Sequence, residues 1–286
     1  MPDPQPRQVL IGDDDSIALR IWDGDTDTAV LLIHGMGDCS WIWDPLFQTW
    51  PGARPTLIAV DLPGHGDSAP VSRREMKSDA VAERLSAALA GYTQMPMWLV
   101  GHSAGAKVAI GLARRAAVPV LGLTLVDTAD DHAPNVRDRL FAHVAGMRKG
   151  AANVRGLVQL VTGTDPFADE DLLDRYFRAA AKHDGAIWKV PVARGIEAIL
   201  ATDIDMTGDL AALDCPVQVI RGDKSSICPE DMAAKFHAAC AHPLPVVAVP
   251  EAGHGITIEN PAPLAEAISG AIAEVQPTAE PLRCSG

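Results

Sequence analysis

The sequence lacks long apolar runs and any excess of positive charge. None of its apolar runs reaches eighteen residues, about the length that a membrane-spanning helix needs. The N-terminus, Met1-Pro2-Asp3-Pro4, has no basic region followed by an apolar one, so we expect no signal peptide. Lysine and arginine together number 24 against 37 aspartate and glutamate residues, a formal net charge of −13. This balance disfavours nucleic acid and anionic membranes as partners.

Cysteine is scarce, and no nucleotide-binding motif is present. The five cysteines are scattered and form no metal-type pair: Cys39, Cys215, Cys228, Cys240 and Cys284. An odd, dispersed set is typical of a reducing compartment, so we expect a cytoplasmic protein. No His, Asp or Glu cluster has metal-ligand spacing, and neither G-x-G-x-x-G nor a phosphate-loop lysine occurs. We therefore predict no metal and no cofactor.

The 286 residues suit one domain with an insertion, or two small domains. Apolar runs predict strands over residues 8–11, 17–22, 29–33, 56–60, 97–100, 120–126, 217–221 and 245–249. Helices are predicted over 74–92, directly after Ser103, and over 229–240 and 261–275. Buried strands that alternate with helices predict an α/β protein with a mostly parallel, doubly wound sheet. Functional sites in such sheets lie at the carboxyl ends of the strands.

The alternation stops after the sixth predicted strand. Residues 130 to 205 contain no strand-like run, and their spacing predicts helices near 136–148, 153–161, 170–183 and 187–201. About 75 residues far exceed an ordinary crossover, so we predict a helical cap over residues 131–205, with a plain helical connection as the alternative. The core then comprises residues 1–130 and 206–275, and residues 276–286 form a flexible tail.

One stretch combines a strand, a sharp turn and a helix around a serine. Trp98 to Val100 end a buried strand, Gly101-His102-Ser103-Ala104-Gly105 follows, and an Ala-rich helical run comes next. A serine at such a bend projects its hydroxyl clear of the sheet, and the flanking glycines leave room for the bend. The helix that begins after Ser103 directs N–H groups toward the same spot. Ser103 is therefore the candidate nucleophile, and an ordinary strand–helix turn is the alternative.

Four motifs in order carry a family resemblance. They are His34-Gly35-Met36-Gly37, the segment Asp61-Leu62-Pro63-Gly64-His65-Gly66-Asp67-Ser68, Gly101-His102-Ser103-Ala104-Gly105, and Gly253-His254 followed by Glu259-Asn260-Pro261. Over residues 8–275 the chain resembles the capped esterases, C–C hydrolases and haloperoxidase-like members of the α/β-hydrolases. The resemblance implies the α/β-hydrolase fold, with His254 as the base. It also implies an oxyanion hole made by the backbone N–H groups of Met36 and Ala104.

The acid that orients His254 is the open point. The resemblance places it a few residues beyond the strand that ends at Arg221, where this sequence has Ser225 and Ser226. Asp127, at the end of the preceding strand, is the favoured substitute, although it can also be a purely structural strand-end aspartate. Asp223 is the alternative, but it lies early in the usual loop.

Other histidines are expected to do no chemistry. His102 adjoins Ser103, and its side chain is expected to point away from the site. His34 and His65 belong to loop motifs that more often hold backbone turns.

The leading functional prediction is a serine hydrolase that cleaves a small, apolar ester, lactone or thioester through an acyl-enzyme on Ser103. C–C hydrolysis of a diketone-like substrate with the same triad, perhydrolysis or acyl transfer, and a non-catalytic small-molecule receptor on the same scaffold remain alternatives. The resemblance would require aspartate at position 103 for an epoxide hydrolase or a dehalogenase. The partner is a small-molecule substrate, and the oligomeric state stays open.

Overall fold

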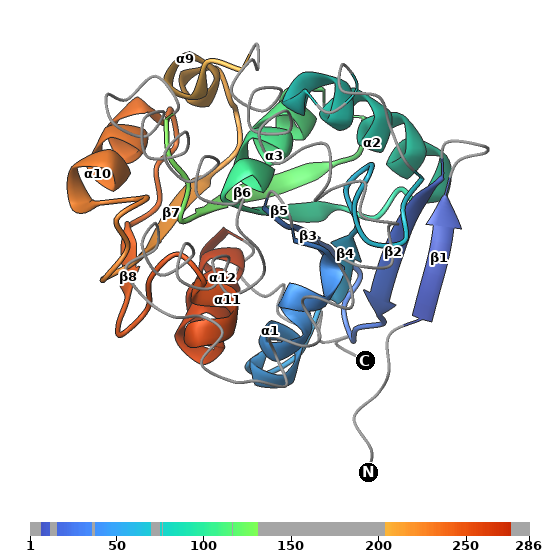
Figure 1. Cartoon of the computed structure of the whole chain (residues 1–286), viewed down its shortest axis with the longest axis horizontal. Coiled ribbons are helices and arrows are strands. Elements are labelled where there is room, and N and C mark those ends of the chain that lie inside the picture. Colours follow the sequence, from blue (N-terminus) through green and yellow to red (C-terminus); the bar gives the residue numbers. More distant parts are fainter. Residues whose placement is uncertain are drawn as a thin grey trace, which may run out of the picture.

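The computed structural model describes residues 7–11, 16–35, 38–69, 75, 77–115, 117–130 and 204–275. Its centre is an eight-stranded sheet in the order β1-β2-β4-β3-β5-β6-β7-β8 (Figure 1). The strands are β1 (Arg7–Ile11), β2 (Ile17–Trp22), β3 (Ala29–Ile33), β4 (Thr56–Val60), β5 (Met97–His102), β6 (Val120–Val126), β7 (Val217–Gly222) and β8 (Val247–Val249). The β1–β2 and β2–β4 pairs are antiparallel, and all later pairs are parallel. The predicted mostly parallel sheet is confirmed.

Helices cover both faces of the sheet. They are η1 (Ser40–Trp43), α1 (Asp44–Thr49), α2 (Ser78–Tyr92), α3 (Ala104–Arg115), α9 (Met206–Ala211), α10 (Glu230–Ala239), α11 (Ile256–Glu259) and α12 (Pro261–Val275). Figure 1 shows α2, α3, α9 and α10 on one face and α1, α11 and α12 on the other. The sequence pattern predicts α2, α3, α10 and α12. It misses the short helices η1, α1, α9 and α11, which have four to six residues each, too few to establish a helical period.

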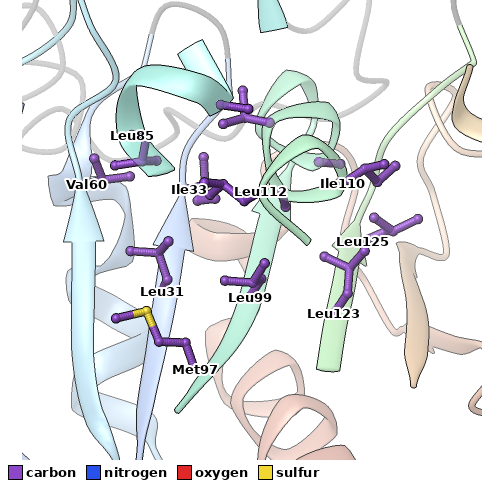
Figure 2. Packing of buried hydrophobic residues seen from close by; sticks show 14 of the residues in the cluster. Leu31, Ile33, Val60, Leu85, Met97, Leu99, Ile110, Leu112, Leu123 and Leu125 are labelled. Carbon is purple, nitrogen blue, oxygen red and sulfur yellow. The ribbon is translucent and has the colours of Figure 1, made fainter. Parts of the chain in front are cut away.

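The continuous apolar runs are explained by two separate cores. In β3, Leu31 and Ile33 join the core under α2 and α3, whereas Val30 and Leu32 join the core over α1 and α12. Figure 2 shows the first core, in which Leu99 of β5 lies beside its neighbour Leu31 of β3. All five residues of β3 are buried, because a central parallel strand has a helix layer on each side. Full burial of each large aliphatic side chain contributes roughly 1.5–3 kcal/mol.

The Asp61–Ser68 motif forms a loop after β4 that is held by internal hydrogen bonds. The Asp61 carboxylate accepts the Ser40 N–H group at 2.6 Å and the Asp67 N–H group at 2.8 Å. Gly66 has a φ of +52° and lies so close to this carboxylate that an added Cβ would be 2.1 Å from it. The motif therefore ties the β4 loop to η1, beside the loop that follows β3.

The predicted cap and tail lie outside the described residues, so the division into residues 1–130, 131–205, 206–275 and 276–286 stays a prediction. Within the parts of the chain that the structure does describe, no helix is long and apolar enough to cross a membrane.

Candidate active site

Ser103 occupies the bend between β5 and α3. Its φ is +53°, a left-handed conformation that is uncommon for a residue with a side chain. Three hydrogen bonds hold it: its N–H group donates to the Val126 carbonyl at 2.9 Å, and its carbonyl accepts from the Ala106 N–H group at 3.0 Å and from Thr128 Oγ1 at 2.9 Å. The surrounding backbone thus fixes the strained bend and presents the hydroxyl at the carboxyl edge of the sheet.

The two glycines of the motif are required by close backbone contacts. A Cβ on Gly105 would lie 2.4 Å from the His34 carbonyl oxygen, and a Cβ on Gly101 would lie 2.5 Å from Ala106 Cα. Neither contact can be relieved by turning a side chain, because both neighbours belong to the backbone. The glycines therefore let α3 approach β3 and β5 closely, as the sequence pattern predicts.

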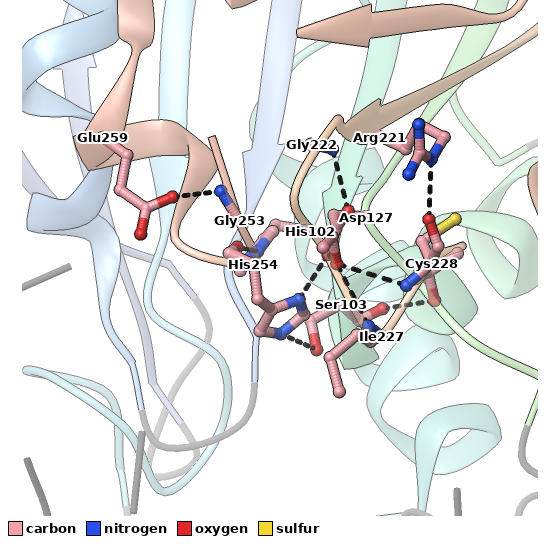
Figure 3. A network of polar contacts seen from close by, with 12 residues as sticks. His102, Ser103, Asp127, Arg221, Gly222, Ile227, Cys228, Gly253, His254 and Glu259 are labelled. Carbon is pink, nitrogen blue, oxygen red and sulfur yellow. Dashed lines mark hydrogen bonds and ion pairs between the residues drawn. The ribbon is translucent and has the colours of Figure 1, made fainter. Parts of the chain in front are cut away.

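His254 reaches Ser103 from a loop far along the chain. The loop connects β8 to α11, and His254 Nε2 lies 3.1 Å from Ser103 Oγ (Figure 3). The Gly253 N–H group donates to the Glu259 carboxylate at 2.5 Å, and Asn260 Nδ2 donates to the Pro250 carbonyl at 2.9 Å. The residues after the Gly-His pair thus hold the loop that presents the imidazole.

Asp127 lies on the other side of the His254 ring. Its Oδ2 is 2.6 Å from His254 Nδ1, and the residue is fully buried at the end of β6 (Figure 3). Oδ1 accepts the Gly222 N–H group at 3.0 Å, and Oδ2 also accepts the Ser225 hydroxyl at 2.7 Å. Its φ of +44° bends the backbone immediately after the strand. The structure therefore joins Asp127, His254 and Ser103 in one hydrogen-bonded chain.

Asp223, the alternative acid, is used differently. Its Oδ1 accepts the Ala252 N–H group at 3.2 Å, and its own N–H group donates to the Val249 carbonyl at 3.0 Å. No hydrogen bond or ion pair links it to His254 across the described residues. Asp223 braces the loop that carries His254, and of the two candidates only Asp127 contacts the imidazole.

The predicted oxyanion hole is described only in part. Ala104 is the first residue of α3, directly after Ser103, which is where a helix N-terminus directs free N–H groups. Met36 lies outside the described residues, so its contribution stays a prediction.

His102 is closer to the site than the sequence suggests, and the expectation that it points away is wrong. Its Nε2 lies 2.8 Å from the backbone carbonyl oxygen of His254, and the two rings are 4.8 Å apart between centroids. Burial lowers the pKa of His102 to about 4, so the ring is neutral and donates through Nε2–H to that carbonyl. Sequence reasoning missed this contact because the partner lies 152 residues away.

His34 and His65 hold turns, as predicted. His34 Nε2 accepts the Leu62 N–H group at 3.0 Å, and Nδ1 lies 2.7 Å from the Gly35 carbonyl. Burial lowers the pKa of His34 well below its ordinary value, which keeps the ring neutral. His65 Nδ1 lies 3.2 Å from the Pro63 carbonyl.

Among the residues that the structure covers, no group of three or more His, Cys, Asp or Glu side chains is arranged to hold a metal ion. The polar groups that converge at the carboxyl edge are a hydroxyl, an imidazole and a carboxylate, and this set can transfer a proton away from an attacking oxygen.

A family model described as the alpha/beta hydrolase family matches residues 30–267. The chain belongs to the alpha/beta hydrolase family. It is an enzyme of the hydrolase class, and the esterase resemblance of its motifs agrees with a relative that is named as an esterase.

Two sequence relatives and one solved structure show which proteins this α/β-hydrolase is similar to. An esterase from Mycobacterium tuberculosis is 27% identical over 95% of this chain and 90% of its own length. A pimeloyl-[acyl-carrier protein] methyl ester esterase from Neisseria meningitidis is 31% identical over 73% of this chain and 65% of its own. The solved structure of a thermophilic esterase from Thermogutta terrifontis superposes with a TM-score of 0.68, at 24% identity, over 94% of this chain and 99% of that one. The last comparison shows the shared fold.

Proposed function

We propose that the protein is a serine esterase that cleaves a small, uncharged carboxylic ester, lactone or thioester through an acyl-enzyme on Ser103. One observation carries this proposal. His254 Nε2 lies 3.1 Å from Ser103 Oγ while His254 Nδ1 lies 2.6 Å from Asp127 Oδ2. A serine hydroxyl is a weak nucleophile until an adjacent base accepts its proton, and a buried carboxylate stabilises the imidazolium that then forms.

The reaction follows from these contacts. Ser103 Oγ bonds to the carbonyl carbon as its proton moves to His254 Nε2, and the carbonyl oxygen becomes negatively charged. The Ala104 N–H group, with that of Met36, holds this oxyanion; each such donor contributes roughly 3 kcal/mol to the transition state. His254 then gives its proton to the departing alcohol. Water attacks the acyl-enzyme with His254 as base, and the carboxylic acid and free Ser103 are regenerated.

The relatives support esters as the substrate class. Two of them are named as esterases, and each is similar to this chain over most of its length. A receptor without catalytic activity would be favoured if the loop after β7 were the only source of an acid for His254, because that loop has Ser225 and Ser226 where the family resemblance implies a carboxylate. That argument loses its force because Asp127 supplies a carboxylate to His254 from the neighbouring strand.

A burst experiment tests the proposal. With p-nitrophenyl butyrate, the enzyme should release one p-nitrophenol per Ser103 before steady turnover, and the intact mass should rise by one butyryl group. Ser103→Ala should show neither effect. Ser269→Ala on α12, away from the site, is the matched control and should behave as the wild type. If neither p-nitrophenyl esters nor alkyl esters or thioesters acylate Ser103, the esterase proposal is wrong.

A further inference from the structure

A second carboxyl group lies beside the candidate nucleophile. Asp38 is in the loop between β3 and η1, and its N–H group donates to the Gly35 carbonyl at 3.4 Å. The position of an ideal Cβ on Gly35 is 3.0 Å from Ser103 Cβ and 3.4 Å from Asp38 Oδ2. His102 Nδ1 lies 3.3 Å from the same point, so the side chains of Ser103, His102 and Asp38 all border Gly35 at the carboxyl edge of the sheet.

The Asp38 carboxyl group makes no hydrogen bond or ion pair with another side chain in the described part of the chain, although His254 is close enough to act on it electrostatically. Only its backbone N–H group takes part in a hydrogen bond there, and its carboxylate is in none of the ion pairs. The titratable groups around it are His254 from the loop before α11, His102 at the end of β5, and the adjacent thiol of Cys39. A carboxyl group in this setting is available to a ligand.

The surroundings disfavour a bare negative charge. Asp38 is partly buried, and this loss of solvent raises its pKa to about 7, a rise that His254 opposes only in part. Burial also raises the pKa of the Cys39 thiol. An ionised carboxylate would in addition oppose the negative charge that develops on the ester oxygen nearby. A hydrogen-bond donor on the substrate removes this conflict, because it satisfies the carboxyl oxygen and spreads its charge.

We propose that Asp38 is a substrate-recognition residue whose carboxyl group accepts a hydrogen bond from a hydroxyl or amide N–H group on the carbon next to the scissile carbonyl. The inference rests on the proposed function of Ser103 and narrows its substrate class. It predicts esters of 2-hydroxy or 2-acylamino acids rather than esters of plain fatty acids.

A matched substrate pair tests this inference. Ethyl lactate and ethyl isobutyrate differ by a hydroxyl in place of a methyl group beside the carbonyl. For the preferred enantiomer of ethyl lactate, we expect wild-type kcat/KM to exceed that for ethyl isobutyrate by roughly tenfold, the effect of one hydrogen bond.

In Asp38→Leu the ratio of the two kcat/KM values should fall to about one. Asp38→Asn should keep part of the preference, since its amide oxygen also accepts. The exposed Asp214→Asn variant, in the segment before the amino end of β7, is the charge-matched control and should keep the full ratio.

The outcomes separate this inference from the proposed function. If wild-type enzyme hydrolyses both esters without preference, or if Asp38→Leu keeps the wild-type ratio, Asp38 does not recognise the substrate although Ser103 is still the nucleophile. If neither ester nor any p-nitrophenyl ester reacts, the proposed function fails.

A binding measurement gives an independent readout. In the Ser103→Ala background, ethyl lactate should raise the melting temperature more than ethyl isobutyrate does, and Asp38→Leu should abolish this difference. Equal shifts for the two esters with Asp38 intact would overturn the inference.

Discussion

Ser225 Oγ donates a hydrogen bond to Asp127 Oδ2 at 2.7 Å, and both side chains are buried. Ser225 Oγ in turn accepts the backbone N–H groups of Ile227 at 3.1 Å and Cys228 at 3.3 Å. Its acceptor positions are thus occupied, and its single proton is directed to Asp127. A serine therefore stands in the loop where the family resemblance implies a carboxylate, and it supports a carboxylate that lies on the neighbouring strand.

Ser225→Ala should lower kcat roughly tenfold with little change in KM, because Asp127 loses one of the donors that orient it toward His254. Steady-state kinetics on p-nitrophenyl butyrate check this, and denaturant unfolding measures the accompanying loss of stability. Ser225→Thr retains the hydroxyl and should recover much of the lost kcat. A variant that is less stable but has unchanged kcat would assign Ser225 a purely structural role.

Asp127→Asn should reduce kcat by a factor of about 10⁴, since the amide cannot stabilise the imidazolium and favours the wrong tautomer of His254. Asp223→Asn is the matched control: it alters the contact with Ala252 but not the one with His254, so its kcat should stay within a few-fold of wild type. Rates near normal in both variants would reject Asp127 as the acid.

His102→Phe keeps a ring but removes the N–H group that the His254 carbonyl accepts. Leaving that carbonyl without a donor should cost about 1–3 kcal/mol of folding free energy and should displace the His254 loop, which lowers kcat. His102→Gln offers an amide donor and should recover part of both losses. Kinetics and chemical denaturation of the two variants check this, and equal behaviour of both would argue against the hydrogen bond.

Gly105→Ala should destabilise the fold by roughly 1–3 kcal/mol, because its Cβ would lie 2.4 Å from the His34 carbonyl oxygen. Gly270→Ala is the matched control on α12, where nothing lies within 4 Å of the added Cβ. That change should instead stabilise the protein by about 0.5–1 kcal/mol, the usual gain of alanine over glycine in a helix. Thermal unfolding of both variants measures the contrast, and a Gly105→Ala variant as stable as wild type would contradict the close approach.

Asp38 should make the stability of the protein depend on pH. Its pKa is about 7 in the folded protein against an ordinary value of 3.8, so between these values the folded state holds a proton that the unfolded state has released. Stability should therefore decline as pH rises from about 4 to about 7, and this loss should persist above pH 7. Asp38→Asn removes the dependence, so the melting temperature of the variant relative to wild type should be higher at pH 8 than at pH 4. An equal difference at both pH values would contradict the raised pKa.

The sequence by itself determined the layered architecture and the bend at Ser103. Runs such as Ala29–Ile33 are apolar at every position, which is typical of a strand covered on both faces. Gly101 and Gly105 flank the serine because the bend brings backbone atoms into contact. The run and the Gly-x-Ser-x-Gly spacing are local patterns, so the sequence reveals them, although the contact of Gly105 with His34 appears only in the folded chain.

Only the tertiary structure decided which carboxylate meets His254 and showed that His102 lies beside it. Asp127 and Asp223 both follow buried strands, and their residue types and spacing allow either to meet His254. The choice of acid depends on the Gly222 N–H group and the Ser225 hydroxyl, which donate to Asp127 from a loop more than ninety residues away. Asp127 meets the ring because Gly222 and Ser225 hold its carboxylate there, and His102 reaches the same loop because the β5 and β8 ends lie at one edge of the sheet. These contacts are properties of the packed molecule, and no local sequence pattern encodes their geometry.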